Sequence, residues 1–274
     1  GDAEPQSICL AEEQGELLGV PREWPGIAYE DKDDSGTSFT SSLHSWSVPL
    51  LPLREGQNLA VAEVLASYEA GFRGVRIESP CGTGKSAMAL ATAAALGTSA
   101  LVLTHKEDLL RQWAVEMQKF YGVSEVGRVQ GDVLDYQGKL LTVATVQTLW
   151  SRRDSLPEEF YRSFGLVVCE EAHRFPARTF AHAISQFPAR YRLGISATWR
   201  RADGLEKVWE WHIGKALVVA DAERLAGEYV QIPYRTSLTD RQFCRDGWPP
   251  KMPFYVSAIA RSKGYNEWLT RQIA

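Results

Sequence analysis

The sequence has few cysteines and no long apolar run, and both shortages narrow the kind of protein it can be. Its 274 residues include four cysteines, far apart and without a CxxC pair: Cys9, Cys81, Cys169 and Cys244. This spacing predicts neither a zinc site nor a disulfide framework, and it fits reduced thiols in a cytoplasmic protein. Apolar stretches such as 87–96 fall short of the ~20 residues of a membrane span. The acidic first 16 residues do not resemble a signal peptide, so we expect an intracellular protein without a membrane partner.

The sequence also lacks a positive net charge, but its charges are unevenly distributed. The formal net charge is −4. Residues 1–34 hold ten acidic and two basic residues, which gives −8, whereas the remainder holds 28 basic and 24 acidic residues, which gives +4. We expect residues 1–45 to form a loosely ordered acidic arm that can bind a protein partner. The rest of the chain can carry a local basic track.

Short apolar runs alternate with helical segments through most of the chain. A helical pattern covers 55–70, and strand-length runs lie at 74–77, 100–103, 140–145, 165–169, 191–195, 217–219 and 229–233. Short runs of this kind between helices are typical of strands that are covered on both faces. The pattern predicts an α/β fold with a doubly wound, mostly parallel sheet and helices on both faces.

A glycine-rich segment follows the run that ends at Ile77. Residues 79–86 read Ser-Pro-Cys-Gly-Thr-Gly-Lys-Ser and precede an alanine-rich helix. A strand, a glycine-rich loop and a helix bring backbone amides and a helix N-terminus to a phosphate. Lys85 is then expected to reach the β and γ phosphates of a nucleotide, and Ser86 to hold magnesium. The alternative is a glycine turn that happens to contain lysine and serine, because Ser79 stands where the strict motif has glycine. The other expected nucleotide-binding residues are Pro80, Cys81, Gly82, Thr83 and Gly84.

Two carboxylates follow the apolar run that ends at Cys169. The segment reads Glu170-Glu171-Ala172-His173. The carboxyl end of a parallel strand is where ligands bind in open sheets. One carboxylate can therefore orient a metal ion while the other positions an attacking water. Taken alone, the segment could also be a solvated strand end.

Taken together, three segments resemble motifs I, II and III of superfamily 2 helicases, namely 79–86, 168–173 and 194–198. Three more segments resemble the XPB-like branch and its bacterial and phage relatives: 187–194, 201–206 and 211–214. The resemblance covers about 51–234. It implies the first RecA-like lobe of a P-loop NTPase, a DNA-dependent ATPase that couples hydrolysis of ATP, with Mg2+, to translocation on or remodelling of DNA.

The resemblance also implies roles for single residues. Gln57 would select adenine, although a capping or solvent role for it stays open. Glu171 would polarise the hydrolytic water, and His173 would link the γ-phosphate to the motif III segment, which contains Ser196, Ala197 and Thr198. Glu170 replaces the usual aspartate, and its extra methylene, about 1.5 Å longer, would slow hydrolysis because Mg2+ tolerates little error in its ligand shell. Trp199 stands where a proline is common, and the sequence offers no mechanism for it.

Two further segments resemble the helicase motifs that hold the sugar-phosphate backbone. The first, 104–113, resembles motif Ia, and the second, 144–149, resembles motif Ib or Ic. Hydroxyls and amides at helix starts suit phosphates without reading bases. A solvated helix face and an ordinary strand-to-helix cap are the alternatives for these two segments. The expected contacts to nucleic acid come from Thr104, His105, Lys106, Thr145 and Gln147.

We therefore expect three parts: the arm at 1–45, an ATP-binding lobe at 46–236, and a connector with the start of a second RecA-like lobe at 237–274. A complete motor needs that second lobe for its arginine finger. Without it, the first lobe should bind ATP and hydrolyse it slowly. Two other functions are compatible with the sequence: a nucleotide-gated, non-catalytic nucleic-acid clamp, and an interaction module that acts through the acidic arm.

Overall fold

The computed structural model describes residues 12–14, 17–19, 46–171, 177–199 and 207–220. The chain divides into two compact units, Gly1–Glu223 and Arg224–Ala274. The second unit lies outside the described residues, and so do the expected strand at 229–233 and the expected connector. Within the expected arm, β1 (Glu12–Gln14) and β2 (Leu17–Gly19) form a two-stranded antiparallel sheet.

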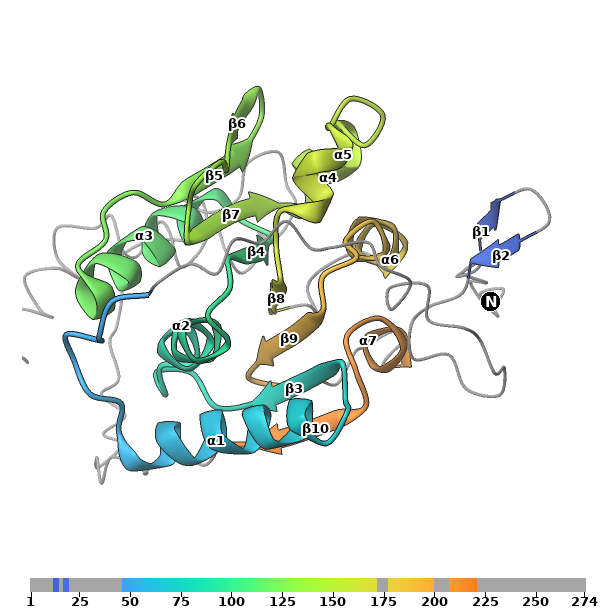
Figure 1. Ribbon diagram of the computed structural model, residues 1–274. Helices are drawn as coiled ribbons and strands as arrows, with labels where there is room; N and C mark the ends of the chain where they lie inside the picture. Colours follow the sequence, from blue (N-terminus) through green and yellow to red (C-terminus); the bar gives the residue numbers. More distant parts are fainter. Residues whose placement is uncertain (1–11, 15–16, 20–45, 172–176, 200–206, 221–274) are drawn as a thin grey trace, which may run out of the picture. The chain divides into compact units, whose positions relative to one another are not determined.

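The main sheet has eight strands in the order β10-β3-β9-β8-β4-β7-β5-β6 (Figure 1). All neighbouring pairs are parallel except β5 and β6. This confirms the predicted doubly wound α/β fold. The strands are β3 (Gly74–Glu78), β4 (Ala100–Thr104), β5 (Gly127–Gln130), β6 (Val133–Asp135), β7 (Leu141–Thr145), β8 (Leu166–Glu170), β9 (Tyr191–Ser196) and β10 (Ala216–Val219).

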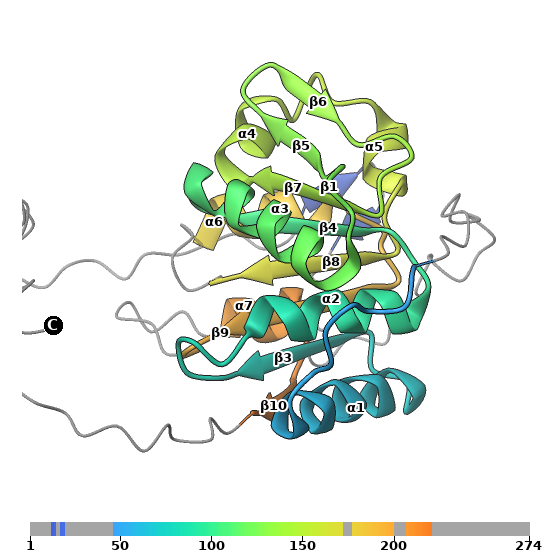
Figure 2. The ribbon, with the colours of Figure 1, turned by 90° about the vertical axis from the view of Figure 1, so that its left-hand side faces the viewer.

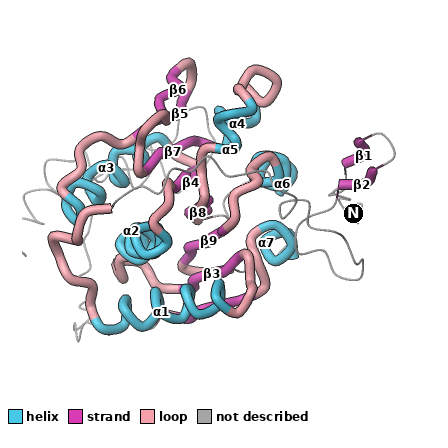
Figure 3. Tube along the Cα trace, in the orientation of Figure 1, coloured by secondary structure: helices cyan, strands magenta, loops and turns pink. Residues whose placement is uncertain are grey.

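Helices cover both faces of this sheet (Figures 2 and 3). One face carries α1 (Glu55–Glu69), α2 (Lys85–Leu96) and α3 (Glu107–Tyr121). The opposite face carries α4 (Val146–Ser151), α5 (Glu158–Arg162), α6 (Ala177–Ser185) and α7 (Lys207–His212).

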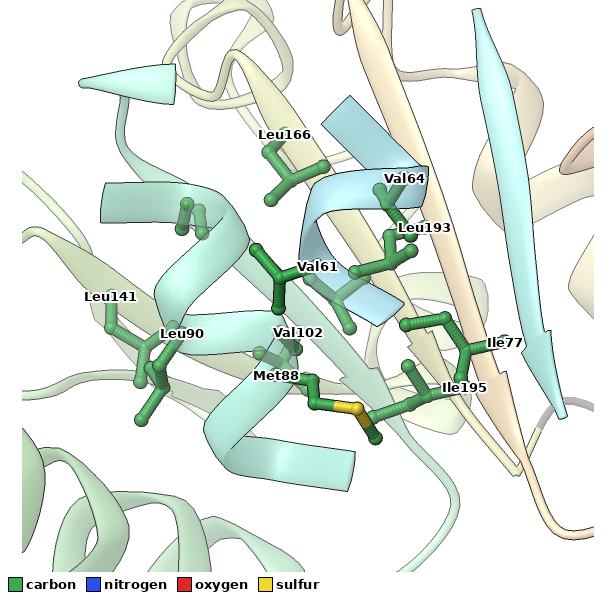
Figure 4. Packing of buried hydrophobic residues seen from close by; sticks show 14 of the residues in the cluster. Val61, Val64, Ile77, Met88, Leu90, Val102, Leu141, Leu166, Leu193 and Ile195 are labelled. Carbon is green, nitrogen blue, oxygen red and sulfur yellow. The ribbon is translucent and has the colours of Figure 1, made fainter. Parts of the chain in front are cut away.

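Alternate residues of each central strand enter two different cores. On β4, Val102 belongs to the cluster under α1 to α3, whereas Leu101 and Leu103 belong to the cluster under α4 to α7. Figure 4 shows Met88 of α2 packed with Val102 and Ile195 in the first cluster. Because side chains alternate along a strand and both faces are buried, most positions of these strands are apolar. This is why the strands were recognisable as continuous apolar runs.

Trp199 fastens the end of β9 to β3. Its indole nitrogen donates a hydrogen bond to the carbonyl oxygen of Ile77 at 3.3 Å. The guanidinium of Arg76 lies 5.5 Å from the centre of the Trp199 ring. A Cβ placed on Gly194 would stand 2.5 Å from that ring, so the tryptophan needs a glycine beneath it. The tryptophan in the usual place of proline therefore packs the two strands together.

His212 at the end of α7 is buried as a neutral ring. It is 2% exposed, and neither of its ring nitrogens has a hydrogen-bond partner. Burial, with a smaller contribution from the positive charge of Arg192, lowers the pKa of His212 to about 3. Protonation of this ring is therefore far less favourable in the folded chain than in the unfolded chain.

The burial of His212 predicts a loss of stability in acid. In the unfolded chain the histidine takes up a proton below about pH 6.5, whereas in the folded chain it does so only near pH 3. Between these pH values the unfolded state therefore binds more protons than the folded state. The free energy of unfolding then falls with falling pH, with a slope approaching about 1.4 kcal/mol per pH unit from this residue. We expect His212→Phe to remove this contribution. Unfolding by denaturant at pH 7 and pH 5 measures it.

Other titrating groups are common to both proteins, so the difference between them isolates His212. An equal fall in the free energy of unfolding for both proteins would contradict the assignment.

Candidate functional site

Three neighbouring strands end at one edge of the sheet. In the register of β3 and β9, Glu78 pairs with Ser196, and in that of β8 and β9, Glu170 pairs with Ile195. The glycine-rich loop follows β3, the acidic pair lies at the end of β8, and the segment 196–198 lies at the end of β9. The parallel register therefore brings these three segments together at the edge where open sheets bind ligands.

The glycine-rich loop has a backbone that only glycine adopts easily. Gly82 and Gly84 have φ values of 81° and 83°, and Gly84 is the N-cap of α2. A Cβ on Gly84 would also collide with the Gln57 amide nitrogen. This conformation turns the chain into the start of a helix whose first amides lack partners within the helix, which suits an anion.

Ser79, the departure from the strict motif, joins the loop to the residue that follows β10. Its buried hydroxyl lies 2.7 Å from the Thr83 hydroxyl and 3.1 Å from the Ala220 carbonyl oxygen. The Thr83 hydroxyl in turn donates to the Pro80 carbonyl oxygen at 2.8 Å. Because each hydroxyl has one proton, Ser79 shares its own between Thr83 and Ala220. The hydroxyl therefore links the loop to the end of β10.

Lys85, Glu171 and Ser196 form a connected set. The Lys85 ammonium donates to the carbonyl oxygens of Ser79 and Pro80 at 3.1 and 3.2 Å, and it lies 3.7 Å from Oε1 of Glu171. The Ser196 hydroxyl donates to Oε2 of Glu171 at 3.3 Å. One carboxylate thus contacts both the loop lysine and the end of β9.

The backbone of Glu171 is held in a left-handed conformation, with φ at 50°. Its amide donates to the carbonyl oxygen of Ile195 at 2.9 Å. Such a conformation is costly for a residue with a side chain and concentrates at functional sites. The fold therefore accepts a backbone conformation that lowers its stability, and this conformation sets the direction of the Glu171 carboxylate.

Ser196 and Thr198 are also joined to each other. The Ser196 hydroxyl lies 2.5 Å from the Thr198 carbonyl oxygen, so its one proton is shared between this oxygen and Oε2 of Glu171, and the hydroxyl accepts from the Thr198 amide at 3.2 Å. Ala197 lies between them in this tight turn. His173, the expected link to this turn, lies outside the described residues.

Glu170 points into the protein rather than into solvent. It is 8% exposed, and its Oε2 accepts a hydrogen bond from the indole nitrogen of Trp113 at 2.6 Å. Burial raises the pKa of Glu170 to about 7, and the charge of Glu171 adds to the rise, while the Trp113 bond and the charge of Lys85 oppose it. A bound cation would favour the charged carboxylate.

A pocket of about 740 Å³ joins these groups. This size is ordinary for a small-molecule site. Three of its walls come from segments in which the sequence predicted nucleotide-binding or metal-binding residues, namely the segment around Gln57, the glycine-rich loop and the acidic pair. The fourth wall comes from α3 and was not predicted. The pocket is lined by Leu51, Pro52, Arg54, Gln57, Cys81, Gly82, Gly84, Lys85, Ser86, Ala87, His105, Lys106, Leu109, Gln112, Glu116, Lys119, Phe120, Glu170 and Glu171.

Gln57 combines a cap with a place in the pocket. Its Oε1 accepts from the Arg54 amide at 2.9 Å, and its Nε2 donates to the Thr83 carbonyl oxygen at 2.7 Å. Arg54 donates to the same carbonyl oxygen at 2.7 Å. The capping alternative is therefore present in the geometry, and both side chains also hold the loop. Arg54 was missed because a lone arginine before a helix carries no sequence signal of this contact.

The donor set fits magnesium. Ser86 and Glu170 both line the pocket beside Lys85. Their oxygens are suitable because Mg2+ prefers oxygen ligands such as carboxylates, waters and substrate phosphates. In the described parts of the chain, no three His, Cys, Asp or Glu side chains gather as a metal site of their own. Likewise, no described helix is long and apolar enough to cross a membrane.

The two segments expected to hold nucleic acid lie side by side. Nε2 of Gln147 donates to the His105 carbonyl oxygen at 3.4 Å, and both Gln147 and Lys106 are exposed. The buried Thr104 hydroxyl donates to the Lys106 carbonyl oxygen at 3.2 Å. Thr145 is the N-cap of α4, as in the capping alternative. Both threonine hydroxyls are buried and have partners within the chain, whereas the side chains of Lys106 and Gln147 are exposed. His105 is half-buried and, like Lys106, lines the pocket.

Comparison with known families gives one match that covers more than half of the chain. The family described as "Type III restriction enzyme, res subunit" matches residues 50–201. This range contains the glycine-rich loop, the acidic pair and the turn after β9.

The curated relatives are helicases and translocases. A putative ATP-dependent RNA helicase of Acanthamoeba polyphaga mimivirus is 27% identical over 245 residues, which are 86% of this chain and 45% of the relative. The DNA 3'-5' translocase XPB2 of Sulfurisphaera tokodaii is 28% identical over 203 residues, which are 72% of this chain and 44% of the relative. The chain thus spans less than half the length of these two relatives.

Solved structures support the fold. A hypothetical ATP-dependent RNA helicase from Sulfolobus tokodaii aligns with a TM-score of 0.51 at 19% identity, covering 63% of this chain and 54% of that one. The Sulfolobus solfataricus SWI2/SNF2 ATPase core in complex with dsDNA aligns with a TM-score of 0.50 at 17% identity, covering 62% of this chain and 37% of that one. The predicted RecA-like fold is confirmed.

The role of Ser79 as a brace is testable by restoring the strict motif. We expect Ser79→Gly to lower the free energy of unfolding by about 1 to 2 kcal/mol, because it removes a buried hydrogen bond and adds backbone freedom. Ser79→Ala removes only the hydroxyl and should cost about 1 kcal/mol. Denaturant unfolding measures both. Unchanged stability in both variants would show that the hydroxyl does not brace the loop.

Proposed function

The chain belongs to the family of type III restriction enzyme res subunits, within the XPB-like branch of the superfamily 2 helicases, and from this premise we propose that it binds ATP and couples ATP hydrolysis to translocation on, or remodelling of, DNA. The observation that carries the proposal is the connected set of Lys85, Glu171 and Ser196 at the sheet edge. It joins a phosphate-binding loop, an acid and the segment that would transmit hydrolysis.

Each part of the set has a role in the proposal. The loop amides and Lys85 would bind the phosphates, and Gln57 and Arg54, which also line the pocket, would face the base. Glu171, aimed by its left-handed backbone, orients the attacking water. Ser196, bonded to Glu171, responds to the change at the γ-phosphate, and its turn with Ala197 and Thr198 moves with it.

Magnesium would be held by Ser86 and Glu170 together with the phosphates, and when bound it would neutralise charge that develops on them. The Glu170 carboxylate must be charged to serve it. Burial disfavours the charged form by raising the pKa of Glu170, whereas the hydrogen bond from Trp113 favours it by lowering that pKa. We propose that this lobe hydrolyses ATP slowly because the carboxylate that would serve the metal is buried and bonded to Trp113.

DNA is the proposed polymer. The relatives' names include both an RNA helicase and a DNA translocase, and the branch resembled by this chain is that of the translocase. Exposed Lys106 and Gln147 would contact backbone phosphates without reading bases. We also propose a cytoplasmic location, since ATP is an intracellular ligand. The acidic residues 1–34 are the segment that we assign to a protein partner.

A nucleotide-gated clamp without turnover is the second candidate. It is favoured by Glu170, whose carboxylate is buried and already bonded to Trp113. Such a protein would bind ATP and DNA together without hydrolysing ATP.

The role of Glu171 gives the first test. Glu171→Gln should keep ATP binding and lower hydrolysis at saturating DNA by about 100-fold or more, because the water loses the group that orients it. Glu159→Gln, an exposed neutral substitution on α5, is the matched control and should hydrolyse ATP as the unaltered chain does. Equal rates for Glu171→Gln and the control would overturn the role of Glu171. ATP binding without turnover by the unaltered chain would favour the clamp.

The DNA surface gives the second test. Lys106→Ala should weaken DNA binding on every sequence and lower the slope of log affinity against log salt by about 1, because one phosphate contact is lost. Lys139→Ala removes the same charge just before β7, at the opposite edge of the sheet, and should leave the slope unchanged. Fluorescence anisotropy over a salt series measures both. The same slope for both variants would remove Lys106 from the DNA surface.

A further inference from the structure

Trp113 and Glu170 are hydrogen-bonded to each other beside the hydrophobic cluster that lies under α1 to α3. Trp113 lies on α3, is 1% exposed, and its indole nitrogen is 2.6 Å from Oε2 of Glu170, 57 residues further along the chain. The indole N–H is the only polar group of a tryptophan side chain, so burial requires an acceptor for it. Here the acceptor is a carboxylate at the pocket rather than a backbone carbonyl.

This contact bears on the most unusual feature of the acidic pair. Glu170 carries one methylene more than the aspartate usual at its position, so its carboxylate has an additional rotatable bond and more positions to occupy. The hydrogen bond is short, at 2.6 Å, and the rigid, fully buried ring on the helix fixes where its N–H points. The bond therefore removes the freedom that the longer side chain introduces.

We propose that Trp113 is a positioning residue that holds the Glu170 carboxylate at the phosphate end of the pocket. The inference rests on the proposed ATPase function. Oε2 is committed to the indole, and Oε1 is the oxygen that stays available to the pocket. On this account, the tryptophan and the glutamate are a matched pair, and the longer acid works because α3 supplies its partner.

A merely structural role for Trp113 makes different predictions. A core tryptophan contributes packing, and replacement by phenylalanine would then lower stability without a selective effect on turnover. Trp209 offers the matched comparison, because it is equally buried, lies on the opposite face of the sheet and packs against Phe180 with ring centres 4.8 Å apart.

The first experiment detects the bond in the full chain without any nucleotide. The indole N–H signals of the 15N-labelled protein are recorded by NMR, and the Trp113 signal is identified by its absence from Trp113→Phe. Glu170→Gln keeps the shape of the acceptor and removes its charge. We expect the Trp113 signal to shift more than any other indole signal in Glu170→Gln. A Trp113 signal that stays in place would overturn the inference.

The second experiment measures ATP hydrolysis at saturating DNA. Trp113→Phe keeps an aromatic ring and removes the N–H, and we expect kcat to fall about 10-fold to 100-fold with KM for ATP changed less than about twofold. Trp209→Phe should keep the kcat of the unaltered chain. An unchanged kcat in Trp113→Phe, or the same fall in both variants, would overturn the inference.

A double-mutant comparison tests the pairing itself. In the Glu170→Asp background the carboxylate is shorter and loses the indole, so Trp113→Phe should cost less than about threefold in kcat there. The same fold-loss in both backgrounds would show that the two residues act independently. If even the unaltered chain fails to hydrolyse ATP, the proposed function is wrong, and the NMR comparison alone then decides whether the bond exists.

Discussion

The site depends on the parallel register of β3, β9 and β8. Parallel strands present their carboxyl ends at one edge, and in this sheet the three neighbours end within a residue of one another, with Glu78 beside Ser196 and Glu170 beside Ile195. The loop after β3, the acids after β8 and the turn after β9 are therefore brought together by backbone pairing. A slip in that register would separate Lys85, Glu171 and Ser196 without altering any of them.

Two helices on the face that carries α1, α2 and α3 hold the side chains of the site in place. The start of α1 holds the phosphate loop through its N-cap Arg54 and through Gln57, which both donate to the Thr83 carbonyl oxygen. The N-cap of α3 is Lys106, in the segment proposed for DNA, and the same helix holds Glu170 through Trp113. One rigid element thus contacts both proposed ligand surfaces.

Much of this arrangement was predictable from the sequence, because buried parallel strands are continuous apolar runs and the glycine-rich loop has a recognisable order. The superfamily and the first RecA-like lobe were predicted and are confirmed. Strands β5 and β6 were missed, since they are only four and three residues long and neither forms a continuous buried apolar run. Trp113 closes the segment that resembles motif Ia, but no local pattern relates it to an acid 57 residues away. Thr104 and Thr145 were expected to contact phosphates. In the structure both side chains are buried and their hydroxyls are hydrogen-bonded within the chain. The sequence does not reveal this, because burial depends on how the chain packs.

Isothermal titration calorimetry of the full chain beside Lys85→Ala measures whether the pocket binds ATP with Mg2+ through the loop lysine. We expect saturable binding at one site by the unaltered chain. Lys85→Ala should bind at least about tenfold more weakly, because the lost charge-assisted contact is worth about 1.4 kcal/mol or more. Thermal unfolding of the two proteins should coincide closely enough to show that the fold is kept. Equal affinity for ATP in both folded proteins would show that the loop lysine is not at the phosphates, and the proposed nucleotide site would then be wrong.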